Sequence, residues 1–141
     1  NGIPVSFKYT EPVTPSEIQK IIYGDNIKNY LAYEILRNED LFKPYDVDIV
    51  FVDDNDLLNY VVTDKILVYI SELSLSRSFE IKENEGVIPL HDNKSLKFYA
   101  SKVVDSNILK RIKYIIDKYD IFEPFGRLKE ALIYICSKRE D

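Results

Sequence analysis

The chain has 141 residues, of which 45% are hydrophobic and 30% are charged, a composition typical of a folded globular protein. One cysteine and one histidine exclude an intramolecular disulfide and argue against a zinc site. No apolar stretch approaches the roughly 18 residues that a membrane span needs, so we expect no membrane contact. The low cysteine content favours a reducing compartment, and we expect an intracellular protein of the cytoplasm or nucleus.

The length predicts a single globular domain over residues 1–141, and the absence of methionine leaves open that the chain is a fragment of a longer one. The net charge of −5 is unevenly distributed. Residues 1–93 carry 8 Lys/Arg and 17 Asp/Glu, whereas residues 94–141 carry 11 and 7. This asymmetry indicates a dipolar surface that steers partners. No glycine-rich phosphate-binding motif is present, so ATP-driven and dinucleotide chemistry are not expected.

The N-terminal part of the chain predicts two helices. Residues 1–13 alternate weakly and predict an edge strand or an extended arm. The sequence TPSE at Thr14–Glu17 is a capping box, which predicts that Thr14 caps the first helix. Ile18, Ile21 and Ile22 share one face of that helix, and Gly24 ends it. A second helix to about Asn38 completes an αα-hairpin or a helix-turn-helix.

The middle of the chain predicts strands. Ile49–Val52 is apolar on both faces, which predicts a strand in the middle of a sheet. A short helix over Asp54–Val62 and a strand over Ile66–Ile70 follow, with enough residues between the strands for a parallel crossover, although a hairpin is also compatible. Three later segments predict an antiparallel meander. These are Arg77–Lys82, Val87–Leu90 and Leu96–Ala100.

The C-terminal part predicts a helix capped by Ser106, a loop with the sequence YDIFEPFGR, and a last helix that turns Leu128, Leu132, Ile135 and Cys136 inward. The element pattern as a whole predicts an α+β fold, with α/β as the alternative. The expected sheet is small, mixed and mostly antiparallel, and it is flanked by an N-terminal and a C-terminal helix pair.

The stretch YDVDIVF at Tyr45–Phe51 places two carboxylates at the start of a strand. Residues two apart share a strand face, so Asp46 and Asp48 are expected to project together. Paired carboxylates at a strand end can hold Mg²⁺ against a triphosphate. We expect instead that these acids only keep the end of a buried strand soluble, with no catalytic residue, metal or cofactor, and Mg²⁺ binding is the alternative.

The same stretch resembles the metal site of the nucleotidyltransferase superfamily over about ten residues. That resemblance implies Mg²⁺-dependent catalysis with Asp46 and Asp48 as metal ligands, and a third carboxylate for which Glu80 is the candidate. The phosphate-holding Gly-Ser element of that superfamily is missing here, because the upstream residues read YEILRNEDLFK.

Cations and aromatic residues near the C-terminus predict a partner-binding surface, because aromatics and arginine dominate interface energetics. The predicted partner-binding residues are Lys110, Arg111, Lys113, Tyr119, Phe122 and Phe125. A hydrophobic plug is the alternative role for the three aromatics. We therefore expect a non-enzymatic interaction domain, an accessory or assembly subunit whose partner is another protein subunit. The alternatives are a divergent nucleotidyltransferase-like domain and a nucleic-acid-binding domain that uses the basic C-terminal helix.

Overall fold

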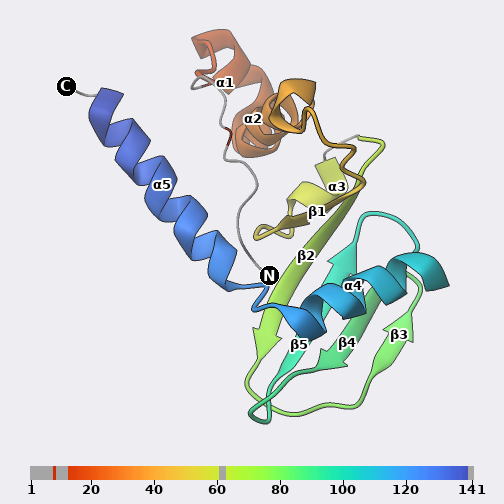
Figure 1. Ribbon diagram of the computed structural model, residues 1–141. Coiled ribbons are helices and arrows are strands. Elements are labelled where there is room, and N and C mark those ends of the chain that lie inside the picture. The colour runs from red at the N-terminus through yellow and green to blue at the C-terminus, as the bar shows by residue number, and fades with distance from the viewer. Residues whose placement is uncertain (1–7, 9–12, 61–62, 140–141) are drawn as a thin grey trace. The chain divides into compact units, whose positions relative to one another are not determined.

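A computed structural model describes residue 8 and residues 13–60 and 63–139 (Figure 1). The fold is α+β with a mixed, mostly antiparallel sheet of five strands, as the sequence predicts. The described residues form two compact units, an N-terminal unit that ends at Val104 and a C-terminal unit that begins at Asp105. Apart from Lys8 and Val13, the arm expected in residues 1–13 lies outside the described residues. The single-domain expectation stays a prediction.

The sheet belongs to the N-terminal unit, and its strand order is β1-β2-β5-β4-β3. The strands are β1 (Ile49–Val52), β2 (Ile66–Leu73), β3 (Glu80–Lys82), β4 (Glu85–Pro89) and β5 (Ser95–Ala100). β1 and β2 are parallel and flank the short helix α3 (Leu57–Tyr60), which confirms the predicted crossover; residues 61–62 lie outside the described residues. The other pairs are antiparallel, so the predicted meander of β3, β4 and β5 is also confirmed.

The central position predicted for β1 is wrong, because β1 lies at an edge of the sheet and pairs only with β2 among the described strands. Val52 and Leu67 form a buried cluster with residues of α2 and α3 on one face of this edge. The residues packed against the cluster are Ala32, Leu36, Val50, Leu57, Leu58 and Tyr69. A strand covered by helices is apolar whether it has one neighbour or two, so its composition does not determine its place in the sheet.

The buried centre of the sheet lies on the other face, where β5 is flanked by β2 and β4. Leu96 and Phe98 are fully buried, and Ile70 and Gly86 are the direct neighbours of Phe98 on the two adjacent strands. Gly86 has no side chain, and an added Cβ atom would lie 2.7 Å from Cε1 of Phe98. The glycine therefore provides the space that the phenyl ring occupies.

The N-terminal helices are α1 (Glu17–Tyr23) and α2 (Ile27–Leu36), joined by a 3₁₀ turn over Gly24–Asn26. The predicted cap at Thr14 is wrong, because Ser16 caps α1. The amide of Gln19 donates to Ser16 Oγ at 3.1 Å, and the amide of Ser16 donates to Gln19 Oε1 at 2.9 Å. Two capping patterns, TPSE and SEIQ, overlap in this stretch, and the chain uses the second. Gly24 ends α1 with a φ of 52°, as predicted.

The C-terminal unit contains α4 (Ser106–Lys118) and α5 (Glu123–Arg139). The predicted cap at Ser106 is wrong by one residue, because Asp105 Oδ1 accepts from the amide of Ile108 at 2.9 Å. Most of the predicted loop YDIFEPFGR is the first turns of α5, since a proline is compatible with the start of a helix. No helix among the described residues has the length and apolar character that crossing a membrane requires.

The inward face predicted for α5 is wrong for Leu128, Leu132 and Cys136, which are exposed, whereas Ile135 is half-buried. Helical spacing places such residues on one face but does not say that another element covers that face. In α4, by contrast, Ile112 and Ile116 of the predicted stripe are buried.

Candidate functional site

The structure does not bring together the three acids of the alternative metal-site hypothesis. Asp46 and Asp48 are exposed and precede β1, whereas Glu80 is on β3 at the opposite edge of the sheet, where it pairs with Arg77 at 3.4 Å. Four strand spacings separate β1 from β3, a distance of about 19 Å. In the part of the chain that the structure describes, no group of three or more His, Cys, Asp or Glu side chains is arranged to hold a metal ion. A metal-binding role for Asp46 and Asp48 as a pair stays a prediction.

Asp54, which follows β1, has a structural role that the sequence did not reveal. Its Oδ1 atom accepts from the amide of Asp56 at 3.0 Å, and its Oδ2 atom forms an ion pair with Lys28 Nζ. The contact connects α2 to the turn that leads into α3. The turn itself is a known preference of aspartate, but a partner 26 residues away in sequence (Lys28 to Asp54) follows only from the fold.

Because of this ion pair, the stability of the fold depends on the protonation of Asp54 and Lys28, and therefore on pH. The hydrogen bond from Lys28 lowers the pKa of Asp54, and the hydrogen bond to Asp54 raises the pKa of Lys28. The carboxylate stabilises the fold above its unfolded pKa of about 3.9, and this contribution is lost as the pH falls through the lower folded value. The ammonium stabilises the fold below about pH 10.4, and this contribution is lost above the raised folded value.

We therefore expect Asp54→Asn to lower the melting temperature at pH 7 and to have a much smaller effect at an acidic pH below the lowered folded pKa of Asp54, where the native carboxylate is also protonated. Circular dichroism melts at both pH values measure this difference. The control is Lys20→Ala, which removes an exposed pair with Glu17 and should leave the melting temperature nearly unchanged. An equal loss at both pH values would show that the ion pair contributes nothing.

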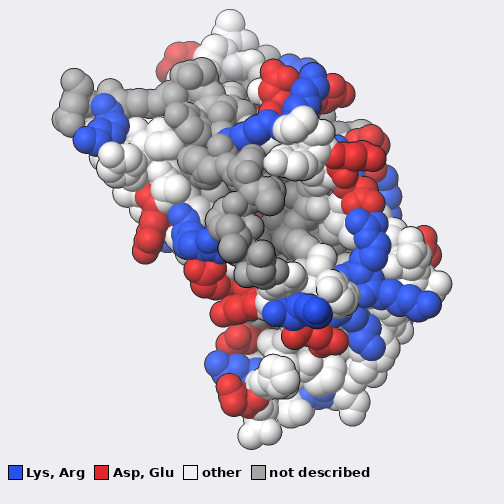
Figure 2. Space-filling view, viewed as in Figure 1, with Lys and Arg blue, Asp and Glu red and all other residues white. Residues whose placement is uncertain are grey.

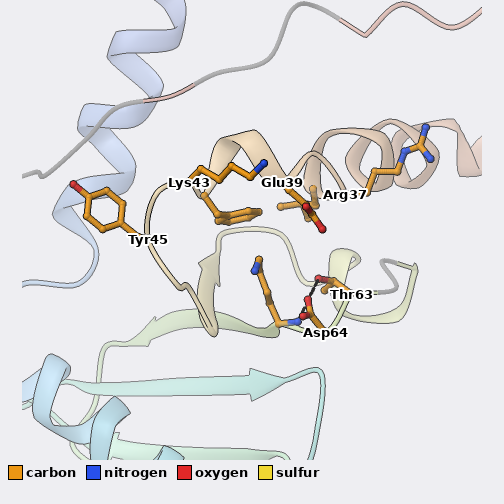
Figure 3. A pocket seen from close by; sticks show the side chains of 9 residues that line it. Arg37, Glu39, Lys43, Tyr45, Thr63 and Asp64 are labelled. Atoms are coloured by element: carbon orange, nitrogen blue, oxygen red, sulfur yellow. Dashed lines mark hydrogen bonds between the residues drawn. The ribbon is translucent and has the colours of Figure 1, made fainter.

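A pocket of about 230 Å³ lies between the end of α2 and the segment before β2 (Figure 3). Its lining residues are Leu36, Arg37, Glu39, Phe42, Lys43, Tyr45, Thr63, Asp64 and Lys65. Lys65 crosses the pocket, with Nζ donating to the Val47 carbonyl at 3.0 Å and lying 4.6 Å from the centroid of the Phe42 ring. Figure 3 shows that Arg37 and Tyr45 point away from this centre.

The cations of this pocket already interact with other groups of the chain. Besides Lys65, Arg37 pairs with Glu34 at 2.8 Å and Lys43 pairs with Asp40 at 3.5 Å. Each of these three cations therefore has a carboxylate or a carbonyl of the protein close to it, so the pocket does not favour an anionic ligand.

The cations predicted to bind a partner lie on α4 and form what we call the α4 basic surface. It consists of Lys110, Arg111, Lys113, Tyr114 and Lys118. Figure 2 shows lysine and arginine side chains gathered over this helix. Tyr114 is 56% exposed, and Lys118 Nζ lies 5.1 Å from the centroid of its ring. A shallow depression of about 280 Å³ is lined by Lys110, Arg111, Tyr114 and Ile115.

The three aromatic residues predicted to bind a partner lie where α4 ends and α5 begins. Tyr119 follows α4, Phe122 immediately precedes α5, and Phe125 lies in the first turn of α5; all three are half-buried. The amide of Phe122 donates to Asp120 Oδ1 at 3.1 Å. The geometry is compatible with both the plug and the anchor, so their role stays a prediction.

The N-terminal unit carries an exposed apolar surface that the sequence did not reveal. Ile18, Ile21 and Ile22, here called the α1 isoleucine surface, are 68%, 80% and 71% exposed. The helix contacts α2 through other residues. Gln19 Nε2 donates to the Tyr30 hydroxyl at 2.8 Å, and the ring of Tyr23 stacks on Tyr30 with centroids 4.4 Å apart. Periodicity identified the isoleucine stripe, but only the contacts with Tyr30 show that it faces outward.

No family model, curated protein or solved structure matches this chain. An α+β fold does not by itself imply a function, so the α4 basic surface and the α1 isoleucine surface are the features that bear on it.

Proposed function

We propose that this chain is a non-enzymatic interaction domain, an accessory or assembly subunit that binds another protein subunit of an intracellular complex. The observation that carries the proposal is the α1 isoleucine surface. Three large aliphatic side chains within five residues of sequence (18, 21 and 22) are each more than two-thirds exposed. Contiguous exposed apolar patches are typical of protein interaction sites.

The size of this surface indicates what kind of partner it fits. Complete burial of an isoleucine side chain contributes about 1.5–3 kcal/mol, and these three are 68–80% exposed, so covering them contributes roughly 3–7 kcal/mol. However, α1 has only seven residues and is about 10 Å long. A stable interface needs roughly 800 Å² from each partner, which two copies of so short a helix do not supply. We therefore propose a partner of different sequence, with an apolar groove for the isoleucines and further contacts beyond α1.

The test compares the wild-type protein with a variant that carries Ile18→Ser, Ile21→Ser and Ile22→Ser. We expect affinity purification with the wild-type protein to recover a specific subunit, and the variant to bind that purified subunit at least 100-fold more weakly by calorimetry. Because the isoleucines are exposed, the circular dichroism spectrum and melting temperature should remain close to those of the wild type.

The matched control is Ile133→Ser with Tyr134→Ser, since both side chains are exposed on α5. This control should keep the affinity for the subunit. Equal binding of the wild-type protein and the α1 variant would contradict the proposal. So would a wild-type protein that forms a stable dimer in light-scattering experiments, because a second copy would then be the occupant.

A further inference from the structure

A second surface, on a different helix, has a chemistry that specifies its ligand more closely. We infer that the α4 basic surface is a docking site for a short acidic segment of a partner polypeptide. The inference deepens the proposed function, and it rests on that proposal for one point, that the ligand is a protein. It depends on different residues, so it can fail independently.

The net charge of α4 is positive. The helix carries four cations and one acid, Asp117. Its buried side is marked by Ile112 and Ile116, whereas Lys110, Arg111 and Lys118 are exposed. The exposed cations attract carboxylates, and the exposure of Lys110 and Lys118 makes these two side chains accessible to a second molecule.

The spacing of the exposed side chains forms a row. Lys110, Tyr114 and Lys118 are four residues apart and therefore lie one above another on the helix surface. The row is about 12 Å long, which matches about four residues of an extended peptide at roughly 3.3 Å per residue. Tyr114 lies between the two lysines, with Lys118 above its ring, so the row offers an apolar contact between two charges.

A short acidic peptide fits this row better than nucleic acid does. Nucleic acid carries phosphates along its whole length and extends beyond a row of this size. Outside α4, residues 105–141 carry 4 Lys/Arg and 6 Asp/Glu, an acidic excess that repels phosphates. Single-stranded binding surfaces also use several aromatic side chains in succession, whereas this row has one. A segment with three or four carboxylates places its charge on the row alone.

The test measures fluorescence anisotropy of a labelled octaglutamate peptide in 20 mM salt. We expect weak binding that 300 mM salt abolishes and that an octaglutamine peptide does not show. The variant Lys110→Glu with Lys118→Glu should bind at least tenfold more weakly, because two attractive contacts become repulsive. Tyr114→Ala should weaken binding by about threefold.

The matched control is Lys129→Glu with Lys138→Glu on α5. Lys138 also lies over a tyrosine, Tyr134, at 5.5 Å, but it does not belong to the α4 row. This control should bind octaglutamate as the wild type does. Unchanged affinity in the α4 variant, or equal losses in both variants, would overturn the inference.

Two further measurements separate this inference from its alternatives. A labelled eight-nucleotide single-stranded DNA should bind more weakly than octaglutamate; tighter binding that the α4 variant loses would make nucleic acid the ligand and overturn the inference. The triple isoleucine variant of α1 should keep its affinity for octaglutamate. If that variant no longer binds the protein partner but still binds octaglutamate as the wild type does, the two surfaces act separately.

Discussion

Replacement of Phe98 by alanine is expected to lower the free energy of unfolding by about 3–5 kcal/mol. The Phe98 side chain is 0% exposed and lies on β5 between Ile70 of β2 and Gly86 of β4. Its removal leaves a cavity in the middle of the sheet that the paired strands cannot fill without breaking their hydrogen bonds. Since domains of this size have total stabilities of about 5–15 kcal/mol, the variant should be close to unfolding at room temperature.

Urea unfolding followed by circular dichroism measures this loss. Leu75→Ala is the control, because Leu75 is 57% exposed in the segment between β2 and β3 and should cost no more than about 0.5 kcal/mol. A loss below about 1.5 kcal/mol for Phe98→Ala would mean that the site collapses around the smaller side chain, and would contradict the packing described for β5.

Replacement of Gly86 by alanine is expected to destabilise the protein by about 1–3 kcal/mol, although the new side chain is only a methyl group. The added Cβ atom would lie 2.5 Å from Ile81 Cδ1 and 2.7 and 2.8 Å from two ring atoms of Phe98. The end of the isoleucine side chain can move aside, but the fully buried ring has little room to shift. The loss of stability is steric, because Gly86 lies on β4 between the paired strands β3 and β5.

Two comparisons isolate this steric cause by urea unfolding. Gly126→Ala changes a glycine of α5 that has no neighbouring atom within 4 Å of an added Cβ, and it should raise stability by about 0.5–1 kcal/mol. In a double-mutant cycle, Phe98→Leu should relieve part of the cost of Gly86→Ala, because the smaller side chain vacates space for the methyl group. Strictly additive losses would contradict the proposed clash.

Much of the fold was predictable from local patterns. The alternating segments predicted β3, β4 and β5 as a meander, and the spacing between β1 and β2 allowed the parallel crossover that the structure contains. Gly24 correctly ended α1, because a residue with positive φ is most easily a glycine. The apolar stripe of α4 correctly placed Ile112 and Ile116 inside, and this also placed the cations of the basic surface outside.

Predictions that needed long-range information were less successful. The apolar composition of β1 suggested a central strand, but its edge position depends on which strands pair with it. The isoleucines of α1 share a face, but only its contacts with α2 turn that face outward. Likewise, Glu80 was a reasonable third ligand in sequence, and only the strand order showed that β3 is far from Asp48.

The sequence by itself therefore determined the kinds of element, their approximate limits and the charge of α4, because backbone propensity, capping and periodicity act within a few residues. Only the tertiary structure decided the order of the strands, the outward direction of the α1 isoleucine surface and the pairing of Lys28 with Asp54. Each of these depends on contacts between residues that are distant in the chain. The free energy of such contacts depends on both partners, and a pattern within a few residues contains only one of them.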